Sequence, residues 1–337
     1  MNKTEPNLVA CGVEVSQKTL LVDLEGHGQR EFPNQPSGQR EMVKWLCSVR
    51  GAVRVCLEAT GLYGLDAALA LDDAGLPVMV ANPRAVRHFA QAAMQRSKTD
   101  QRDAAVLREF ARRMEFEPWR RLSTTALHLL AVARRFRAVV QMQTAEKNRL
   151  HAAGISRALP AMLRREVERS VARLEQDRKR LLCMARELVQ QDPVLARRHA
   201  LLLSVCGIGE ASALALLAEL HPVGQEATAR QWVAYAGLDP REHTSGSSVA
   251  QKPRISAKGN SNLRRALYMP AVVASRREPH LKAFYERLLG RGKSKRQAQV
   301  AVMRKLLHGI FGMFKHDQPF DGSKLFCEQP KWEVVCA

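Results

Sequence analysis

Short apolar runs and amphipathic stretches alternate along the first third of the chain. Two apolar runs, residues 9–15 and 19–23, are separated by a brief polar link and predict a β-hairpin. Residues 52–57 and 77–81 are two further apolar runs of strand length. Strands that alternate with helices predict an α/β layer domain over residues 1–118. Helical periodicity marks three stretches between and after the strands, which are residues 37–49, 63–74 and 100–114.

Local signals place the ends of these three helices. Ser37 is a favourable N-cap for the first helix, because a serine oxygen accepts hydrogen bonds from free backbone N–H groups. Gly75 ends the second helix, since glycine readily adopts the left-handed conformation found after a helix. The third helix begins near Asp100.

Beyond Pro118 the pattern changes to long charged helices. Residues 127–153 and 162–191 are both helical in pattern, and the break at 154–160 lets them pack as an antiparallel pair. Several apolar residues of the second helix recur near a spacing of 3.5, which predicts a coiled-coil hairpin over residues 119–192. The hairpin is expected to serve as a spacer or as a dimerisation arm. The sequence leaves open whether its arginines also bind nucleic acid. The residues at this spacing are Leu163, Val167, Val171, Leu174, Leu181 and Leu188.

The third segment, residues 193–326, is predicted to be mostly helical. Residues 207–209 and 237–259 interrupt it as glycine-rich loops, and residues 262–275 resume as a helix. The chain after Gly322 lacks periodicity and is expected to be loosely ordered, with a flexible tail over 327–337.

The charge of the 337-residue chain is uneven. Residues 1–118 hold 15 basic and 15 acidic residues, whereas the remainder holds 38 basic and 18 acidic residues and carries the whole net charge of +20. A basic half of this size favours a polyanion such as nucleic acid, because each neutralised phosphate releases counterions. The alternative is a basic surface that is merely solvated.

The remaining composition narrows the class of protein. Seven scattered cysteines without a CxxC pair indicate reduced thiols rather than a zinc site or a disulfide framework. The sequence has no apolar run of membrane-spanning length and no apolar signal-peptide core, so no membrane partner is expected. We therefore expect a cytoplasmic protein.

Four carboxylates of the first segment stand at strand ends or a helix start. Glu14 lies at the end of the first strand, Glu58 directly follows residues 52–57, and Asp100 and Asp103 share one face of a helix start. Carboxylates that converge at one sheet edge repel each other unless a cation is present. Oxygen ligands suit Mg²⁺ or Mn²⁺, and two such ions would support phosphodiester cleavage.

Each carboxylate also has a purely structural explanation. Asp100 is a suitable N-cap, and Asp103 and Glu58 are suited to surface ion pairs. The cations Lys98 and Arg102 beside the aspartates bind a DNA strand or balance the charge of one helix face. The order of all four acids along the chain favours the metal site.

Two further segments carry candidate phosphate-binding groups. Residues 201–220 resemble a helix–hairpin–helix, in which Gly207 and Gly209 would present backbone N–H groups to a phosphate. The alternative is a plain helical corner.

The loop that begins after residue 240 combines small residues with cations. Ser245 in this basic setting is a candidate nucleophile for a phosphodiester, and His243 would move a proton or contact phosphate. A flexible loop that tracks a nucleic-acid backbone, with His243 in solvent, is the alternative. The other candidate nucleic-acid contacts are Arg241, Ser247, Ser248, Lys252, Arg254, Lys258, Arg264 and Arg265.

These segments together resemble the insertion-sequence one-ten family of transposases, whose N-terminal domain is the RuvC-like, RNase H-like DEDD type. The resemblance implies an α/β RNase H-like domain, a helical coiled-coil hairpin and a mostly α C-terminal transposase domain. It covers nearly the whole chain. The motifs that carry it are GVEVS (12–16), CLEATGLY (56–63), NPRAVRHFA (82–90), KTDQRDA (98–104), GIGEASA (207–213), YAGLDPRE (235–242), SGSSV (245–249) and LRRALYMPA (263–271).

The resemblance also assigns residues. The four acidic positions of the family fall on Glu14, Glu58, Asp100 and Asp103, and its nucleophilic serine falls on Ser245. The first acid is usually Asp, whereas this chain has Glu14, whose side chain is one methylene longer. The longer side chain shifts a bound metal or weakens its binding.

The mechanism is likewise implied by the resemblance. Members excise and insert a mobile element with a Mg²⁺-dependent acidic site and a serine that holds a DNA strand as a phosphoserine link. A structured non-coding guide RNA, called bridge or seeker RNA, pairs with donor and target DNA. We therefore expect a bacterial, nucleoid-associated recombinase that forms a homodimer and assembles into a tetramer on DNA, with its site formed in cis or across protomers.

Two other classes of protein are weighed against this one. A metal-dependent Holliday-junction endonuclease would use the acidic residues for hydrolysis and would not need Ser245. A non-enzymatic RNA- or DNA-binding protein would not need Glu58, Asp100 or Asp103.

Overall fold

The computed structural model describes residues 8–59, 61, 63–93, 99–155, 160–224, 226–245 and 249–327, with the backbone alone at 241–245 and 249–254. The chain divides into two compact units, Met1–Arg121 and Leu122–Ala337. Lys98, Ser247, Ser248 and the tail after Cys327 lie outside the described residues.

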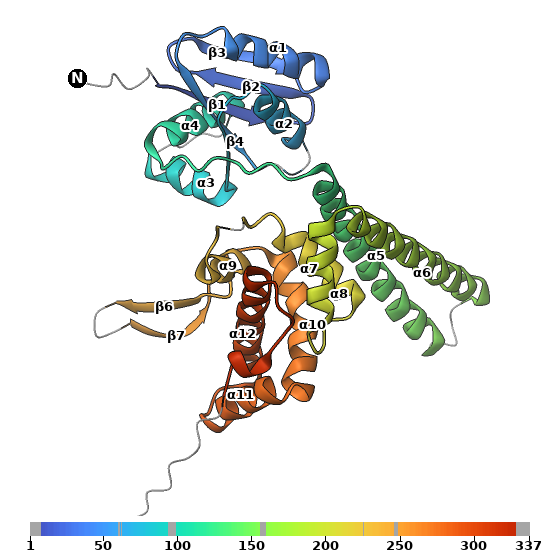
Figure 1. Cartoon of the computed structure of the whole chain (residues 1–337). Coiled ribbons are helices and arrows are strands. Elements are labelled where there is room, and N and C mark those ends of the chain that lie inside the picture. The colour runs from blue at the N-terminus through green and yellow to red at the C-terminus, as the bar shows by residue number, and fades with distance from the viewer. Residues whose placement is uncertain are drawn as a thin grey trace, which may run out of the picture. The chain divides into compact units, whose positions relative to one another are not determined.

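A mixed five-stranded sheet forms the centre of the first unit (Figure 1). Its order is β3-β2-β1-β4-β5; β1 pairs in antiparallel fashion with β2 and in parallel fashion with β4. The parallel half arises because β4 and β5 each follow a helical crossover. This sheet with its helices confirms the predicted RNase H-like α/β fold. The strands are β1 (Leu8–Val15), β2 (Thr19–Leu24), β3 (Gly28–Pro33), β4 (Ala52–Glu58) and β5 (Val78–Ala81).

Four helices cover the two faces of this sheet. Side chains alternate along β1, so that Val13 packs into the core that contains Leu46 and Leu71, while Ala10 packs into the core that contains Phe110. The first core lies under α1 and α2, and the second lies under α3 and α4. The helices are α1 (Pro36–Cys47), α2 (Leu65–Asp73), α3 (Pro83–Ala92) and α4 (Asp100–Arg113).

The first unit differs from the sequence prediction in three places. The prediction lacked β3, because the strand exposes polar side chains and buries only Phe32. It also lacked α3, which Asn82 caps through a hydrogen bond from the Arg84 backbone N–H. The predicted N-cap Ser37 is wrong: the N-cap is Gln35, since Pro36 occupies the first helical position, where its missing N–H costs nothing.

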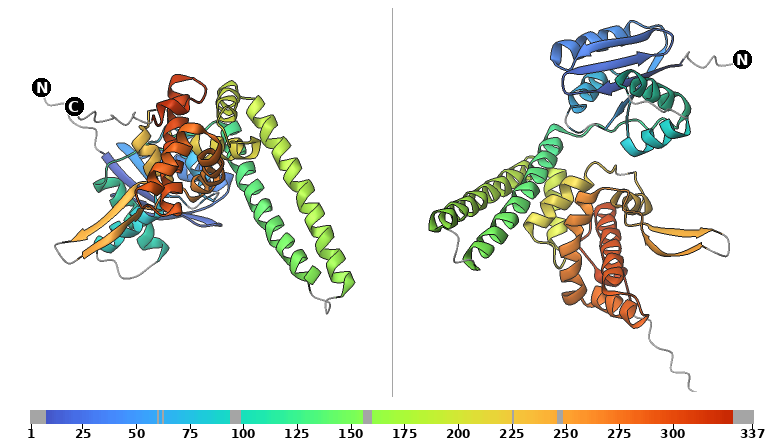
Figure 2. Two further views of the ribbon diagram at one scale, coloured as in Figure 1. Left: turned by 90° about the horizontal axis from the view of Figure 1, so that it is seen from below. Right: turned by 180° about the vertical axis from the view of Figure 1, so that it is seen from behind.

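A long helical hairpin opens the second unit, as predicted. Its helices are α5 (Thr124–Ile155) and α6 (Ala161–Gln190), which pack along each other (Figures 1 and 2). Leu174, Ala185 and Val189 are the buried residues of α6. The predicted contact residue Leu163 is 46% exposed, because it lies near the tip of the hairpin.

The rest of the second unit is a helical bundle. Trp232 packs edge-on against Phe311 and Phe314 in its core, which also contains Leu267 and Leu306. None of the described helices is long and apolar enough to cross a membrane. The bundle consists of α7 (Pro193–Leu203), α8 (Glu210–Leu220), α9 (Ala229–Ala236), α10 (Ser261–Arg277), α11 (Pro279–Gly290) and α12 (Lys295–His316).

Two predicted loops of the second unit are ordered. The expected loop at 237–259 contains an antiparallel hairpin of β6 (Pro240–Ser245) and β7 (Val249–Ile255). The chain after Gly322 was expected to be loose, but it forms a short 3₁₀ helix, η1 (Gly322–Lys324). Leu325 packs on the core there, which holds the segment down without a helical pattern.

Candidate functional site

Parallel pairing of β1 and β4 brings two of the predicted carboxylates to the same edge of the sheet. Val13 pairs with Leu57, so Glu14 and Glu58 occupy the next positions along the two strands. Glu58 also pairs with Ala81 of β5. Both carboxylate residues are half-buried. Two neighbouring carboxylates attract a cation, which offsets the repulsion between them.

Helix α4 packs directly on β1 at Gly12. A Cβ atom added to Gly12 would lie 2.1 Å from the backbone oxygen of Ala104 and 2.3 Å from the backbone nitrogen of Arg108. Only glycine permits this approach. Gly12 and Glu14 point to the same face of the sheet, since side chains alternate along a strand.

Two ion pairs fix the direction of α4 along β1. Arg112 pairs with Glu25 at 2.9 Å, and one turn earlier Arg108 pairs with Asp23 at 2.5 Å. Asp23 lies beside Gly12 in the sheet, and Glu25 bonds the backbone of Ala10. The first turn of α4 therefore lies toward the end of β1 that carries Glu14.

That first turn contains the two predicted aspartates. Asp103 is half-buried and Asp100 is exposed. The alternative role of Asp100 as the N-cap is wrong, because the N-cap is Thr99, whose side chain accepts a hydrogen bond from the Arg102 backbone N–H at 3.4 Å. Both aspartates lie in the first turn of α4, near the positive end of the helix.

The four acids share an edge but do not form a closed ligand set. Among the residues that the structure describes, no group of three or more His, Cys, Asp or Glu side chains is arranged to hold a metal ion. The residue types nevertheless fit a hard divalent cation, since all four donors are carboxylate oxygens.

Asp23 is a residue of this region that sequence reasoning missed. Its side chain is nearly fully buried, and it accepts hydrogen bonds from Arg108 and, at 2.6 Å, from Gln29. Burial disfavours the charged form of Arg108, but the attraction and hydrogen bonds of Asp23 and Glu109 together outweigh it and raise the pKa of the guanidinium. The signal in the sequence was an acid at the end of the apolar run of residues 19–23.

The candidate serine lies at the end of β6. Its backbone pairs with Val249, which places Ser245 at the tip of the hairpin. Arg241 pairs with Arg254 in the same hairpin, and His243 pairs with Gln251. Two arginines at directly opposed positions repel each other unless an anion lies between or beside them. The backbone register thus concentrates positive charge on the hairpin that carries the serine.

Other predicted nucleic-acid contacts divide into internal and exposed residues. Arg264 donates hydrogen bonds to the backbone oxygens of Ala236 at 2.8 Å and Gly259 at 3.0 Å, so its guanidinium holds a turn. Lys258 and Arg265 are exposed. The exposed pair remains suited to nucleic acid, whereas Arg264 has a structural role.

The glycine turn between α7 and α8 also has a structural component. Gly207 has a φ of +95°, and a Cβ there would lie 2.8 Å from the backbone oxygen of Pro270. Gly207 therefore permits close packing against α10. Gly209 is exposed and precedes α8 as its N-cap, with no side-chain cap, so it stays a candidate phosphate contact.

A buried carboxylate network, also missed from sequence, joins α5, α8 and α10. Glu219 accepts hydrogen bonds from Arg134 at 3.1 and 3.2 Å, from Asn260 at 2.7 Å and from Asn262 at 3.0 Å. Burial disfavours the charged form of Glu219, but these hydrogen bonds outweigh it and lower the pKa. The signal in the sequence was an acid, Glu219, flanked by apolar residues near the end of the segment that forms α8.

Transposase family models match residues in both units. Residues 8–153 match a DEDD transposase model of the IS110 type, described as a transposase, and residues 199–286 match the transposase IS116/IS110/IS902 family. Pilin gene-inverting proteins of Moraxella bovis and Moraxella lacunata are each 26% identical over 92% of this chain and 97% of their own length. An uncharacterized 43.6 kDa protein of insertion element IS110 from Streptomyces coelicolor is 31% identical over 39% of this chain and 33% of its own length.

The fold, the carboxylates near the sheet edge and the family matches all indicate a transposase. A DEDD transposase domain implies the use of a divalent metal ion, in keeping with the carboxylates on β1, β4 and α4. Transposases bind DNA and transfer phosphoryl groups within it. The chain belongs to the IS116/IS110/IS902 family of insertion-sequence transposases.

Proposed function

We propose that this transposase is an RNA-guided recombinase that excises and integrates an insertion sequence. The observation that carries the proposal is the pairing of β1 with β4, which sets Glu14 beside Glu58 at the sheet edge toward which α4 directs Asp100 and Asp103. These four acids are the ligands for Mg²⁺ or Mn²⁺. The bound ion supplies charge neutralisation at a scissile phosphate.

Ser245 is the proposed nucleophile. Its hydroxyl loses a proton, its oxygen bonds to the phosphorus of a DNA phosphodiester, and one ester oxygen leaves as a sugar hydroxyl after it takes up a proton. The sugar hydroxyl of a second strand then attacks the same phosphorus. The bond between phosphorus and the serine oxygen breaks, the new pair of strands is joined, and the serine takes up a proton and is restored. Each phosphodiester bond that breaks is replaced by another phosphate ester bond, so the exchange needs no external energy source.

The basic hairpin supports the proposed role of Ser245. Arg241, Lys252 and Arg254 lie on the same two-stranded hairpin, β6 and β7, as Ser245. Cations at these positions bind the phosphate and stabilise the charge that develops during attack. His243 is proposed to contact the same phosphate or to help move a proton during the attack.

The names of the similar proteins agree with a recombinase. Inversion of a pilin gene, which is the activity named for the Moraxella proteins, cuts and rejoins DNA at two sites. The same chemistry serves excision and integration. Specificity is proposed to come from a structured guide RNA that pairs with donor and target DNA, so that the protein itself reads few bases.

The helical hairpin is proposed to join two copies of the chain. Met142 on α5 and Met184 on α6 are 48% and 43% exposed, and Leu163 is 46% exposed. Exposed apolar side chains along a hairpin favour burial against a second copy. We infer a homodimer that assembles into a tetramer on DNA.

A recombination assay tests the mechanism. Donor and target plasmids are combined with the guide RNA and with wild type, Ser245→Ala, Asp103→Asn or the exposed-serine control Ser261→Ala, and junction products and covalent protein–DNA adducts are measured. We expect both site variants to be inactive, Ser245→Ala to form no adduct and Ser261→Ala to match wild type. Omission of the guide RNA is expected to abolish the junctions.

Other results would redirect the assignment. Recombination by Ser245→Ala together with an inactive Asp103→Asn would point to a metal-dependent Holliday-junction endonuclease. Activity in both variants would leave the acids as structural residues and contradict the proposed site. Junction formation without guide RNA would contradict RNA guidance.

A further inference from the structure

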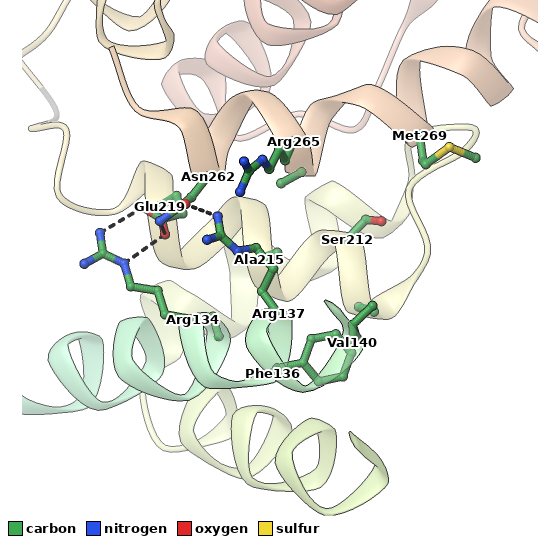
Figure 3. Close-up of a pocket in the computed structure, with 13 residues that line it drawn as sticks. Arg134, Phe136, Arg137, Val140, Ser212, Ala215, Glu219, Asn262, Arg265 and Met269 are labelled. Carbon is green, nitrogen blue, oxygen red and sulfur yellow. Dashed lines mark hydrogen bonds and ion pairs between the residues drawn. The ribbon is translucent and has the colours of Figure 1, made fainter. Parts of the chain in front are cut away.

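A pocket of about 240 Å³ lies between α5, α8 and α10 in the second unit (Figure 3). Arg137 and Arg265 line one part of it, and Phe136, Val140 and Met269 line another. All of these residues belong to one compact unit. The pocket thus combines a cationic region with an apolar wall, a combination that suits a ligand with one charged and one apolar part.

The carboxylate that lines the pocket, Glu219, offsets only part of the positive charge, because Arg134, Arg137 and Arg265 line the pocket as well. Glu219 already accepts four hydrogen bonds, from Arg134, Asn260 and Asn262, which fill the lone-pair positions of a carboxylate. Arg137 instead donates to the side-chain oxygen of Asn262, a neutral acceptor. One carboxylate thus faces three guanidinium groups, which leaves the pocket with a net positive charge.

Arg137 retains unused hydrogen-bonding capacity. Among the residues that the structure describes, none accepts a hydrogen bond from the buried Nε of Arg137. Burial and repulsion by Arg265 lower the pKa of Arg137, and an anion bound between the two guanidinium groups would offset that repulsion. Figure 3 shows the Arg265 side chain reaching from α10 toward that of Arg137.

The apolar wall includes an aromatic ring. Phe136 is half-buried, and in Figure 3 its ring lies beside Val140 on the side of the pocket formed by α5. The side chain of Met269 is 58% exposed at the rim. A flat aromatic ring stacks with any nucleobase, since every base has a π-face.

We propose that this pocket holds one unpaired nucleotide of a bound nucleic acid, with its phosphate on Arg137 and Arg265 and its base against Phe136. The inference rests on the proposed function, because it assumes that the protein binds nucleic acid. An unpaired nucleotide is favoured over a paired one, since a base within a duplex has no free face to stack on the ring. The nucleotide belongs either to a guide RNA or to a DNA strand.

Binding of labelled oligonucleotides of about 15 nucleotides tests the inference. The probes are a thymidine DNA strand, a uridine RNA strand, a base-free DNA strand of the same backbone, and a blunt DNA duplex. The proteins are full-length wild type, Phe136→Leu, Arg265→Ala and Arg276→Ala. Arg276 is an exposed arginine of the last turn of α10 and provides a charge-matched control.

The expected affinities distinguish the contribution of the base from that of the phosphate. Phe136→Leu is expected to weaken binding of base-containing single strands about tenfold and to leave the base-free strand unchanged. Arg265→Ala is expected to weaken all single strands about fivefold and to reduce the salt slope by about 0.7, the value for one phosphate contact. Arg276→Ala is expected to change the affinity less than about twofold.

Each alternative result has a defined meaning. Tighter binding of the uridine strand than of the thymidine strand would assign the nucleotide to RNA, and the reverse order would assign it to DNA. The inference alone is overturned if Phe136→Leu weakens base-free and base-containing strands equally, or if Arg265→Ala matches Arg276→Ala. Failure of wild type to bind any probe would overturn the proposed function as well. Thermal melting of each variant confirms that it is folded.

Discussion

Arg108 of α4 donates a hydrogen bond to Asp23 of β2 at 2.5 Å, and this pair sets the position of α4 against the sheet. The pair lies at the level of Gly12, two residues before Glu14. Helix α4 also carries Asp100 and Asp103 in its first turn. A side-chain contact outside the acidic set therefore controls where two of its members lie.

Arg108→Leu is expected to destabilise the first unit by about 3 kcal/mol, because it leaves the buried Asp23 carboxylate without its cation. Urea unfolding followed by circular dichroism measures the loss. The double variant with Asp23→Asn removes the uncompensated charge and is expected to recover part of the stability. Equal stability of wild type and Arg108→Leu would contradict a role for this pair in holding α4.

Gly12→Ala is expected to destabilise the protein by about 2 kcal/mol and to reduce recombination, because the new methyl group displaces α4. The added Cβ would lie 2.1 Å from a backbone oxygen, which no side-chain rotation relieves. Gly312→Ala is the control, since it lies inside α12 with open space around its Cβ position. That control is expected to stabilise the protein by about 0.5–1 kcal/mol, as alanine favours helix over glycine.

The Gly12 contact illustrates what the sequence allowed us to predict. Strands β1 and β4 were evident from their apolar runs, and the carboxylates at their ends were predicted to converge at one sheet edge with the pair at the helix start. The close approach of α4 to Gly12 depends on packing between segments about 90 residues apart, so no local pattern revealed it. The same reason hid the ion pair between Asp23 and Arg108.

The second unit shows a different limit of the sequence. The helical hairpin was predicted from long periodic segments, whereas β6 and β7 were missed because basic and small residues replace an apolar alternation there. The Glu219 network was missed since its partners come from α5 and α10. Polar networks across several helices depend on tertiary structure, whereas periodicity reports only one face of one helix.

Glu219→Gln is expected to destabilise the second unit by about 2–3 kcal/mol at pH 7, because Arg134 loses its buried partner. The pKa of Glu219 is lowered in the folded state, since its hydrogen bonds outweigh burial. Its contribution is therefore complete above the usual glutamate pKa and is lost as the pH falls through the lower, folded-state value. Unfolding midpoints of both proteins measured from pH 7 down to pH 3 should converge in acid. A constant difference over this range would show that the charge of Glu219 is not the cause.

Metal binding provides the most direct test of the four acids. Mg²⁺ and Mn²⁺ are expected to raise the melting temperature of wild type, because an ion bound to the folded state stabilises it by mass action. Glu58→Gln and Asp103→Asn are expected to remove this increase, and Asp66→Asn, an acid in the first turn of α2, is expected to preserve it. The readout is binding itself and does not depend on recombination. A metal-induced increase that survives in Glu58→Gln and Asp103→Asn would place the ion elsewhere.

Glu14→Asp extends this test to the position at which the chain differs from the usual aspartate of the resembled family. Glu14 stands beside Glu58 in the register of β1 and β4, and its side chain is one methylene longer than that of aspartate. The shorter side chain draws the carboxylate back toward the strand and loses less rotamer freedom when it binds an ion. We therefore expect Glu14→Asp to bind Mn²⁺ about as tightly as wild type or up to about tenfold more tightly, a factor that corresponds to about 1.4 kcal/mol. Titration calorimetry with Mn²⁺ measures the change, and Glu14→Gln serves as the charge-removing control. Weaker Mn²⁺ binding by Glu14→Asp than by wild type would show that the remaining ligands of this chain are arranged for the longer side chain.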